Sequence, residues 1–175
     1  DSEGCHGVSG LDGFDFPRDN PLKPSDRKAV EVMADVLRNS REKVVLIGTG
    51  PLTNLGLLIR TFPELCEEKV RCISLMGGTC HFILTRPFME FNTYLDAEAT
   101  KIVFESGLPI TMYGYDVTYR TLFGQDFLDS LKALGNRTGL MMSCLLQEFW
   151  NMHNRVWIDR SMTHVRWQVS STLLL

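Results

Sequence analysis

The sequence predicts an α/β domain built on a mostly parallel sheet that is flanked by helices. Short β-branched runs alternate with stretches whose apolar residues recur at helical spacing, and glycine or proline separates most of them. This alternation is typical of strand–helix–strand units, which place consecutive strands parallel in one sheet. The 175 residues, 44% hydrophobic and 22% charged, are enough for one domain with a buried core.

The first half of the chain predicts a helix, a strand and a second helix. Ser25 or Asp26 can cap a helix over about 26–39, because a side-chain oxygen there satisfies a free N–H of the first turn. Residues 44–47 form a β-branched run ended by a glycine, a pattern that predicts a buried parallel strand. The leucine-rich helix that follows is expected to end at Pro63.

The second half continues the alternation with two strands and three helices. Asp96 is expected to cap the first of these helices, and the glycine after Ser106 is expected to stop it. The predicted strands cover residues 70–76 and 109–113, and the last two helices lie near 126–134 and 139–153.

Composition excludes several classes of partner. The formal net charge of −3 and the lack of a Lys/Arg block argue against a nucleic-acid surface. No apolar run approaches the roughly 18–20 residues that a membrane helix needs. The five cysteines are scattered, with no C-x-x-C pair, which suits reduced thiols better than disulfides or zinc. We therefore expect a cytoplasmic protein with no nucleic-acid and no membrane partner.

Two loops are expected at the carboxyl ends of strands, where parallel sheets collect binding chemistry. One spans residues 48–54, and the other begins at Met76-Gly77-Gly78. The first loop could offer backbone N–H groups to a phosphate, but it lacks the Lys-Ser/Thr pair of a P-loop. A tight turn with a polar side chain near the helix cap is an equally good interpretation.

Glu90-Phe91-Asn92 is a second candidate for binding. If this stretch is extended, Glu90 and Asn92 face one side, because alternate residues of an extended chain do so. A carboxylate and an amide together could hydrogen-bond the hydroxyls of a sugar. The alternatives are a solvated loop edge for this pair and a structural role for His6.

Five motifs follow one another in the order and near the spacing of one known family. They are Cys5-His6-Gly7-Val8-Ser9-Gly10-Leu11-Asp12-Gly13, Thr49-Gly50-Pro51-Leu52-Thr53-Asn54, Met76-Gly77-Gly78, Glu90-Phe91-Asn92 with Asp96-Ala97-Glu98-Ala99, and Asp116-Val117-Thr118. With them the chain resembles the inosine–uridine preferring nucleoside hydrolases, over residues 5 to about 157. The resemblance implies a nucleoside hydrolase-like fold and cleavage of the N-glycosidic bond of ribonucleosides, in nucleoside catabolism or purine salvage. It also implies a Ca²⁺-bound water as nucleophile, and a homo-oligomer when the protein is intact.

The resemblance also implies roles for five residues. Glu90 matches the residue that binds the ribose 5′-hydroxyl, and Asn92 matches the amide that contacts ribose hydroxyls near the metal. Thr49 would offer its main-chain carbonyl to Ca²⁺. Met76 would pack against the sugar, and His6 would lie on the base side of the pocket. A sixth residue, in the Asp-x-Thr turn that begins at position 116, is interpreted as structural.

The sequence departs from the family pattern at three places. The aspartate-rich motif that supplies the general base and much of the calcium shell would lie before Asp1, so residues 1–158 are expected to be a partial domain truncated at its N-terminus. Leu84 replaces an asparagine and cannot hydrogen-bond a hydroxyl. Val165 follows His164 where the family has aspartate, and valine cannot ligate a metal. No catalytic residue is therefore expected in this chain.

Residues 159–175 are expected to form an atypical tail. Shifted by one base, the codons of Asp159 to Gln168 can encode the family's Pro-Leu-His-Asp-Pro segment and the residues after it. Met162-Thr163 fixes the aspartate codon of that shifted reading. The tail is therefore interpreted as a frameshift or alternative-splice product, and coding DNA without a shifted His-Asp would contradict this.

Three functions stay open from the sequence. The first is a ribonucleoside hydrolase fragment that is inactive as given. The second is a non-catalytic nucleoside-binding relative that has lost its metal site. The third is an unrelated α/β nucleotide-binding domain that uses residues 48–54. The sequence does not fix the preferred base.

Overall fold

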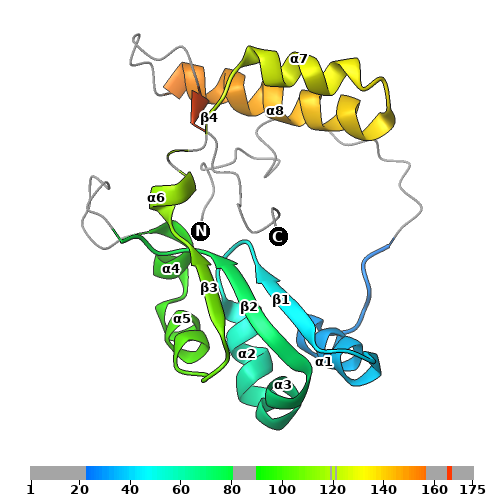
Figure 1. Ribbon diagram of the computed structural model, residues 1–175, viewed down its shortest axis with the longest axis vertical. Helices are drawn as coiled ribbons and strands as arrows, with labels where there is room; N and C mark the ends of the chain where they lie inside the picture. The colour runs from blue at the N-terminus through cyan, green and yellow to red at the C-terminus, as the bar shows by residue number, and fades with distance from the viewer. Residues whose placement is uncertain (1–22, 81–89, 119, 121, 157–164, 167–175) are drawn as a thin grey trace. The chain divides into compact units, whose positions relative to one another are not determined.

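A computed structural model of the chain describes residues 23–80, 90–118, 120, 122–156 and 165–166. The chain divides into two compact units, one containing Pro24–Arg120 and the other containing Thr121–Trp167 (Figure 1). The first unit holds the larger sheet and the predicted binding residues that the structure describes. His6, Leu84 and His164 lie outside the described residues.

The unit containing Pro24–Arg120 is built on a three-stranded parallel sheet. Its strands are β1 (Val44–Gly48), β2 (Val70–Met76) and β3 (Ile110–Tyr113), in the spatial order β1-β2-β3. In this register Ile73, at the centre of β2, lies opposite Leu46 of β1 and Ile110 of β3. The strands occupy the predicted positions within one residue, and their parallel direction confirms the predicted α/β class.

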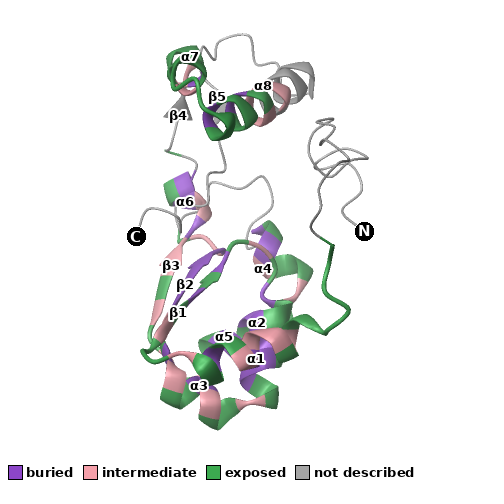
Figure 2. Ribbon diagram, turned by 90° about the vertical axis from the view of Figure 1, so that its right-hand side faces the viewer, coloured by how far each residue is buried: buried purple, intermediate pink, exposed green. Residues whose placement is uncertain are grey.

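Helices cover one face of this sheet, as Figure 2 shows. They are α1 (Ala29–Asn39), α2 (Thr53–Thr61), α3 (Pro63–Lys69) and α5 (Ala97–Phe104). Their apolar sides and the facing side chains of β1 and β2 form a single hydrophobic cluster, because each amphipathic helix buries its apolar stripe against the sheet. The fully buried side chains at its centre include Leu37, Leu58, Ile73, Leu75 and Val103.

The opposite face of the sheet is apolar and exposed on β1. Val45 and Ile47 alternate with the buried Leu46, and their side chains are 40% and 51% exposed. Ser74, the neighbour of Ile47 on β2, is buried, and its hydroxyl has no hydrogen-bond partner among the described residues. Parallel sheets are usually covered on both faces, so this face is the least typical part of the unit.

The predicted start of the first helix is wrong. Neither Ser25 nor Asp26 caps α1, which begins at Ala29 after Lys28 with no side-chain cap. The Ser25 hydroxyl instead accepts a hydrogen bond from the N–H of Arg27, a local turn that competes with helix capping.

Pro63 ends α2 as predicted, but it also begins α3, a helix that the sequence interpretation missed. Proline fits the first helical position because it needs no N–H partner there and its φ is already helical. The same residue therefore serves as a stop for one helix and a start for the next.

The unit containing Thr121–Trp167 is a pair of packed helices, α7 (Gln125–Ala133) and α8 (Arg137–Val156), which confirms the last two predicted helices. Gly139 allows the close approach, since a Cβ there would lie 2.5 Å from the carbonyl oxygen of Leu131. The short strands β4 (Leu122–Phe123) and β5 (Val165–Arg166) pair antiparallel. None of the helices in the described part of the chain is long and apolar enough to cross a membrane.

Candidate functional site

The predicted binding residues that the structure describes lie at or after the carboxyl ends of β1 and β2, and the segment after β3 lies beside them. Thr49 follows β1, Gly77-Gly78 follows β2, and Gly114 follows β3 before the short helix α6 (Tyr115–Thr118), which Figure 1 shows at the end of that strand. Backbone hydrogen bonds tie the last two segments together: the Tyr115 N–H donates to the Gly78 carbonyl over 2.8 Å. Parallel strands bring the two predicted loops to one edge of the sheet, together with the segment after β3.

Glu90 is the most highly connected polar side chain at this edge. It is the N-cap of α4 (Phe91–Leu95) and is only 3% exposed. Its Oε1 accepts the Asn92 N–H at 3.0 Å. Its Oε2 accepts the N–H of Gly78 at 3.0 Å, and both the N–H and the hydroxyl of Thr93 at 2.9 Å. Four donors thus hold one buried carboxylate and join the end of β2 to α4.

Asn92 lies beside Glu90 with its amide directed at the end of β2. Its Nδ2 donates to the main-chain oxygen of Met76 at 3.3 Å and approaches the Met76 sulfur at 3.1 Å. Asn92 is 8% exposed, whereas Phe91 between the two polar residues is 40% exposed. The amide oxygen of Asn92 accepts no hydrogen bond from a described residue, so it is available to a ligand.

The extended conformation expected for residues 90–92 is wrong, although the pairing it predicted is present. Glu90 itself has an extended backbone, with φ −78° and ψ 137°, but Phe91 and Asn92 belong to α4. An N-cap residue points its side chain back at the first-turn N–H groups. That geometry, rather than strand alternation, brings Glu90 and Asn92 to the same side.

Thr49 and Met76 occupy different environments. Met76, the last residue of β2, is buried beneath Asn92 and is 2% exposed. Thr49 is exposed, one residue beyond β1. Thr53, at the start of α2, donates its hydroxyl to the Asp96 carboxylate, so the loop after β1 is tied to the same α4–α5 segment that carries Glu90.

Asp96 caps α5, as predicted. Its Oδ1 accepts the Ala99 N–H at 2.9 Å, and its Oδ2 accepts the Thr53 hydroxyl. The hydrogen bond from Thr53 and then that from the Ala99 N–H hold the pKa of this carboxyl below its ordinary value. A depressed folded-state pKa means that ionised Asp96 favours the folded state above the ordinary aspartate pKa, and that this contribution falls as the pH drops through the folded-state pKa.

We expect Asp96→Asn to lower the free energy of unfolding at pH 7 by up to about 1 kcal/mol, because asparagine still caps a helix but carries no charge. The difference from the unsubstituted chain should shrink below about pH 4, where the unfolded aspartate becomes protonated. Urea unfolding at pH 7 and pH 3 measures both values. Asp26→Asn, at an exposed position outside the helices, is the control and should change little. A loss of unfolding free energy in Asp96→Asn that is larger at pH 3 than at pH 7 would contradict this expectation.

Asp116 has a structural role consistent with its interpretation from sequence. It lies in α6 and is 9% exposed, and it accepts the Thr79 hydroxyl at 2.9 Å and the Cys80 N–H at 2.6 Å. These bonds tie α6 to the loop after β2.

The sequence interpretation missed Thr93, whose only local signal is its place three residues after a capping side chain.

The described residues do not fit a calcium site by themselves. Ca²⁺ takes about 6–8 oxygen ligands, mostly from carboxylates and carbonyls. The described ranges contain no group of three or more His, Cys, Asp or Glu side chains that could hold a metal ion. Thr49 offers at most one main-chain carbonyl, and Glu90 is held by four protein donors.

The start of α2 is a poor phosphate site. The carboxylate of Asp96 already lies against Thr53, the first residue of that helix. A negative charge in that place repels an anion that would otherwise be attracted to the helix N-terminus. This observation weighs against the interpretation of residues 48–54 as a nucleotide-phosphate loop.

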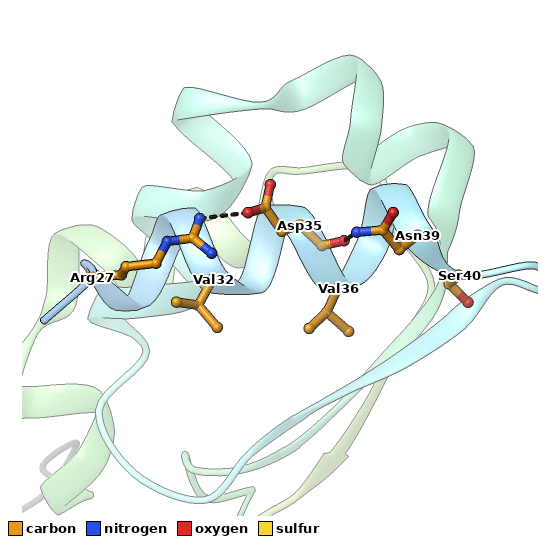
Figure 3. A pocket seen from close by; sticks show the side chains of 6 residues that line it. All are labelled: Arg27, Val32, Asp35, Val36, Asn39 and Ser40. Atoms are coloured by element: carbon orange, nitrogen blue, oxygen red, sulfur yellow. Dashed lines mark hydrogen bonds and ion pairs between the residues drawn. The ribbon is translucent and has the colours of Figure 1, made fainter. Parts of the chain in front are cut away.

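A surface hollow along α1 contains none of the predicted binding residues (Figure 3). Arg27 and Arg38 both bond the carboxylate of Asp35, and these hydrogen bonds lower the pKa of that carboxyl. All three side chains are well exposed, so the ion pairs are of the surface type that contributes little to stability. The hollow is lined by Arg27, Val32, Asp35, Val36, Asn39 and Ser40.

The fold and this strand edge define a parallel α/β protein with a buried carboxylate and a buried amide beside the end of its central strand. The chain belongs to the inosine-uridine preferring nucleoside hydrolase family, whose model matches residues 1–165.

Curated relatives and solved structures agree with this membership. The chain is 40% identical over 152 residues to the pyrimidine-specific ribonucleoside hydrolase RihA of Escherichia coli O9:H4 (strain HS), which covers 87% of this chain and 48% of the relative. A purine-preferring ribonucleoside hydrolase from Gardnerella vaginalis superposes with a TM-score of 0.79 at 26% identity, over 97% of this chain and 53% of that one. A plant nucleoside hydrolase has the same fold, with a TM-score of 0.78 at 22% identity over 97% of this chain and 52% of that one. The chain spans about half the length of the relatives it matches.

Proposed function

We propose that Glu90, Asn92 and Met76 form the ribose-binding side of the pocket of a ribonucleoside hydrolase, called the ribose wall below. Such an enzyme cleaves the N-glycosidic bond of ribonucleosides to give base and ribose. The observation that carries the proposal is the pair formed by the Glu90 carboxylate and the Asn92 amide at the strand edge, in a chain that belongs to a nucleoside hydrolase family.

The hydrogen bonds of Glu90 support a contact between its carboxylate and the 5′-hydroxyl of ribose. An ionised carboxylate has about four acceptor positions, two on each oxygen. Among the described residues, three donors converge on Oε2, whereas one donor, the Asn92 N–H, reaches Oε1. Oε1 therefore keeps one acceptor position, which suits the 5′-hydroxyl of ribose as donor.

Asn92 and Met76 support a second contact. The amide nitrogen of Asn92 is engaged by the oxygen and sulfur of Met76, which turns its amide oxygen toward the ligand side. That oxygen can accept a hydrogen bond from a ribose hydroxyl. Met76 thus supports the amide from below, and its thioether adds an apolar surface beneath the sugar.

We propose further that the 175 residues bind ribose weakly and do not hydrolyse nucleosides. Cleavage of this bond needs an activated water and stabilisation of an oxocarbenium-like sugar, and the described residues contain no cluster of His, Cys, Asp or Glu side chains that could hold a metal ion to supply that water. In the intact enzyme Ca²⁺ would supply the activated water, and Thr49 would be one of its ligands. His6, on the base side of the pocket, belongs to the same proposal.

The test measures binding and turnover on the same preparation of the 175-residue chain. NMR titration with uridine and with inosine should give millimolar affinity, and a reducing-sugar assay with Ca²⁺ should detect no ribose release. Full-length RihA of E. coli is the positive control for the assay. Ribose release by the chain would contradict its inactivity, and the absence of nucleoside binding would contradict the ribose wall.

The same proposal extends to three features of the intact protein. We propose that it forms a homo-oligomer and that it is cytoplasmic, the latter from its scattered cysteines with no C-x-x-C pair. We also propose that residues 159–175 are a frameshifted or alternatively spliced tail. Sequencing the transcript across residues 155–175 tests the last point directly.

A further inference from the structure

We infer that Thr93 is a positioning residue for the ribose contact, because its hydroxyl holds one oxygen of Glu90 and so leaves the other oxygen to the sugar. The inference rests on the proposed function and names a residue that neither the motif comparison nor the sequence interpretation assigned. Thr93 lies in the first turn of α4, three residues after Glu90.

Three groups form a closed hydrogen-bonded triangle at this point. The Gly78 N–H donates to Thr93 Oγ1 at 2.9 Å and to Glu90 Oε2 at 3.0 Å. The Thr93 hydroxyl donates to the same Oε2 at 2.9 Å. Because Oγ1 accepts from Gly78, its own proton is directed toward Oε2, and the orientation of the hydroxyl is fixed.

The turn after β2 is built around this triangle. Gly78 has φ +70°, a conformation that glycine adopts easily, and this turns its N–H toward the α4 side chains. A Cβ at Gly77 would lie 3.3 Å from Thr93 Oγ1 and 3.5 Å from Glu90 Oε2. The carboxylate is therefore fixed from the strand side and from the helix side at once.

The triangle has a consequence for the ligand. With Oε2 filled by three donors, rotation of the carboxylate would break several hydrogen bonds, so Oε1 is the oxygen with an acceptor position left for a ligand. Loss of the Thr93 hydroxyl removes one of the three donors that hold Oε2 and so loosens the carboxylate. A ligand that hydrogen-bonds Glu90 must then order the carboxylate on binding, which weakens its affinity. The affinity of a ligand that does not contact Glu90 is unchanged.

The experiment compares two substitutions of similar size and two ligands. Thr93→Val removes the hydroxyl and keeps the branched shape, whereas Thr93→Ser keeps the hydroxyl. We expect Thr93→Val to weaken uridine binding by the 175-residue chain about tenfold, the scale of one charge-assisted hydrogen bond. Thr93→Ser should stay within about twofold, and 5′-deoxyuridine, which lacks the hydroxyl that Glu90 would bind, should be affected within about twofold by either substitution. Equal weakening of both ligands by Thr93→Val would show a merely structural role and overturn the inference.

A ligand-free measurement separates this inference from the proposed function. The ¹³C chemical shift of the Glu90 side-chain carboxyl should move in Thr93→Val and stay near its original value in Thr93→Ser. If uridine does not bind the unsubstituted chain, the proposed ribose wall is contradicted. The carboxyl chemical shift still tests whether the Thr93 hydroxyl positions the Glu90 carboxylate. A carboxyl shift that is the same in all three chains would overturn the positioning role whatever the nucleoside result.

Discussion

Glu90→Gln is expected to abolish detectable nucleoside binding and to lower the free energy of unfolding by about 3 kcal/mol. The four donors around Glu90 all need acceptor oxygens. Glutamine supplies one oxygen, and its NH₂ group would face either the Asn92 N–H or the donors from Gly78 and Thr93. At least one buried donor is then left without an acceptor, and the remaining hydrogen bonds lose their charge. Urea unfolding followed by NMR titration with uridine measures both effects.

Glu67→Gln is the matched control for this substitution. Glu67 lies in α3 and is exposed, and its main-chain oxygen accepts a hydrogen bond from the Lys43 ammonium. The change should alter stability by less than about 0.5 kcal/mol. If Glu90→Gln is no more destabilising than Glu67→Gln, the carboxylate does not hold α4 against the end of β2.

Gly56→Val is expected to lower the free energy of unfolding by about 2–3 kcal/mol through overpacking. Gly56 is buried in α2, where that helix crosses α5. A Cβ there would lie 3.0 Å from the Cβ and 3.1 Å from the Cα of Ala99. The second atom is backbone, so the contact can be relieved only by moving one helix away from the other. The gain in helix propensity over glycine offsets only about 0.5 kcal/mol.

The same substitution should also disturb the site. Ala99 is the residue whose N–H donates to Asp96, so a shift of α5 changes the bond between Asp96 and Thr53. Urea unfolding measures the stability, and amide chemical shifts of residues 53 and 96 follow the displacement. Gly50→Ala is the control, since a Cβ at Gly50 would have no neighbour within 4 Å. A chain with Gly56→Val that unfolds at the original urea concentration would show that α2 and α5 are not closely packed.

Local sequence signals predicted some of these features well. Asp96 caps its helix because capping depends on a side chain and the N–H groups two or three residues later, all within one turn. The strands were equally clear, because β-branched runs bounded by glycine are local patterns. Ser25 shows the limit of such signals, since its hydroxyl had a competing local partner in Arg27.

The partners of Glu90 could not be predicted in the same way. The donor from Gly78 comes from a segment twelve residues earlier, and its direction depends on a turn with positive φ at the end of β2. The crossing of α2 and α5 at Gly56 likewise joins residues that are 43 positions apart, Gly56 and Ala99. No pattern within one element contains either contact.

The sequence by itself determined the α/β class, the order of the strands along the chain and the polar residues at the ends of β1 and β2. It did so because helical spacing, β-branched runs and family motifs are properties of short segments. Only the tertiary structure decided which oxygen of Glu90 accepts fewer hydrogen bonds from the described residues, that Asn92 lies over Met76, and that Thr93 completes the network. Those relations depend on parallel strands bringing distant loops to one edge of the sheet, where the hydrogen-bond partners of each buried group are fixed by packing.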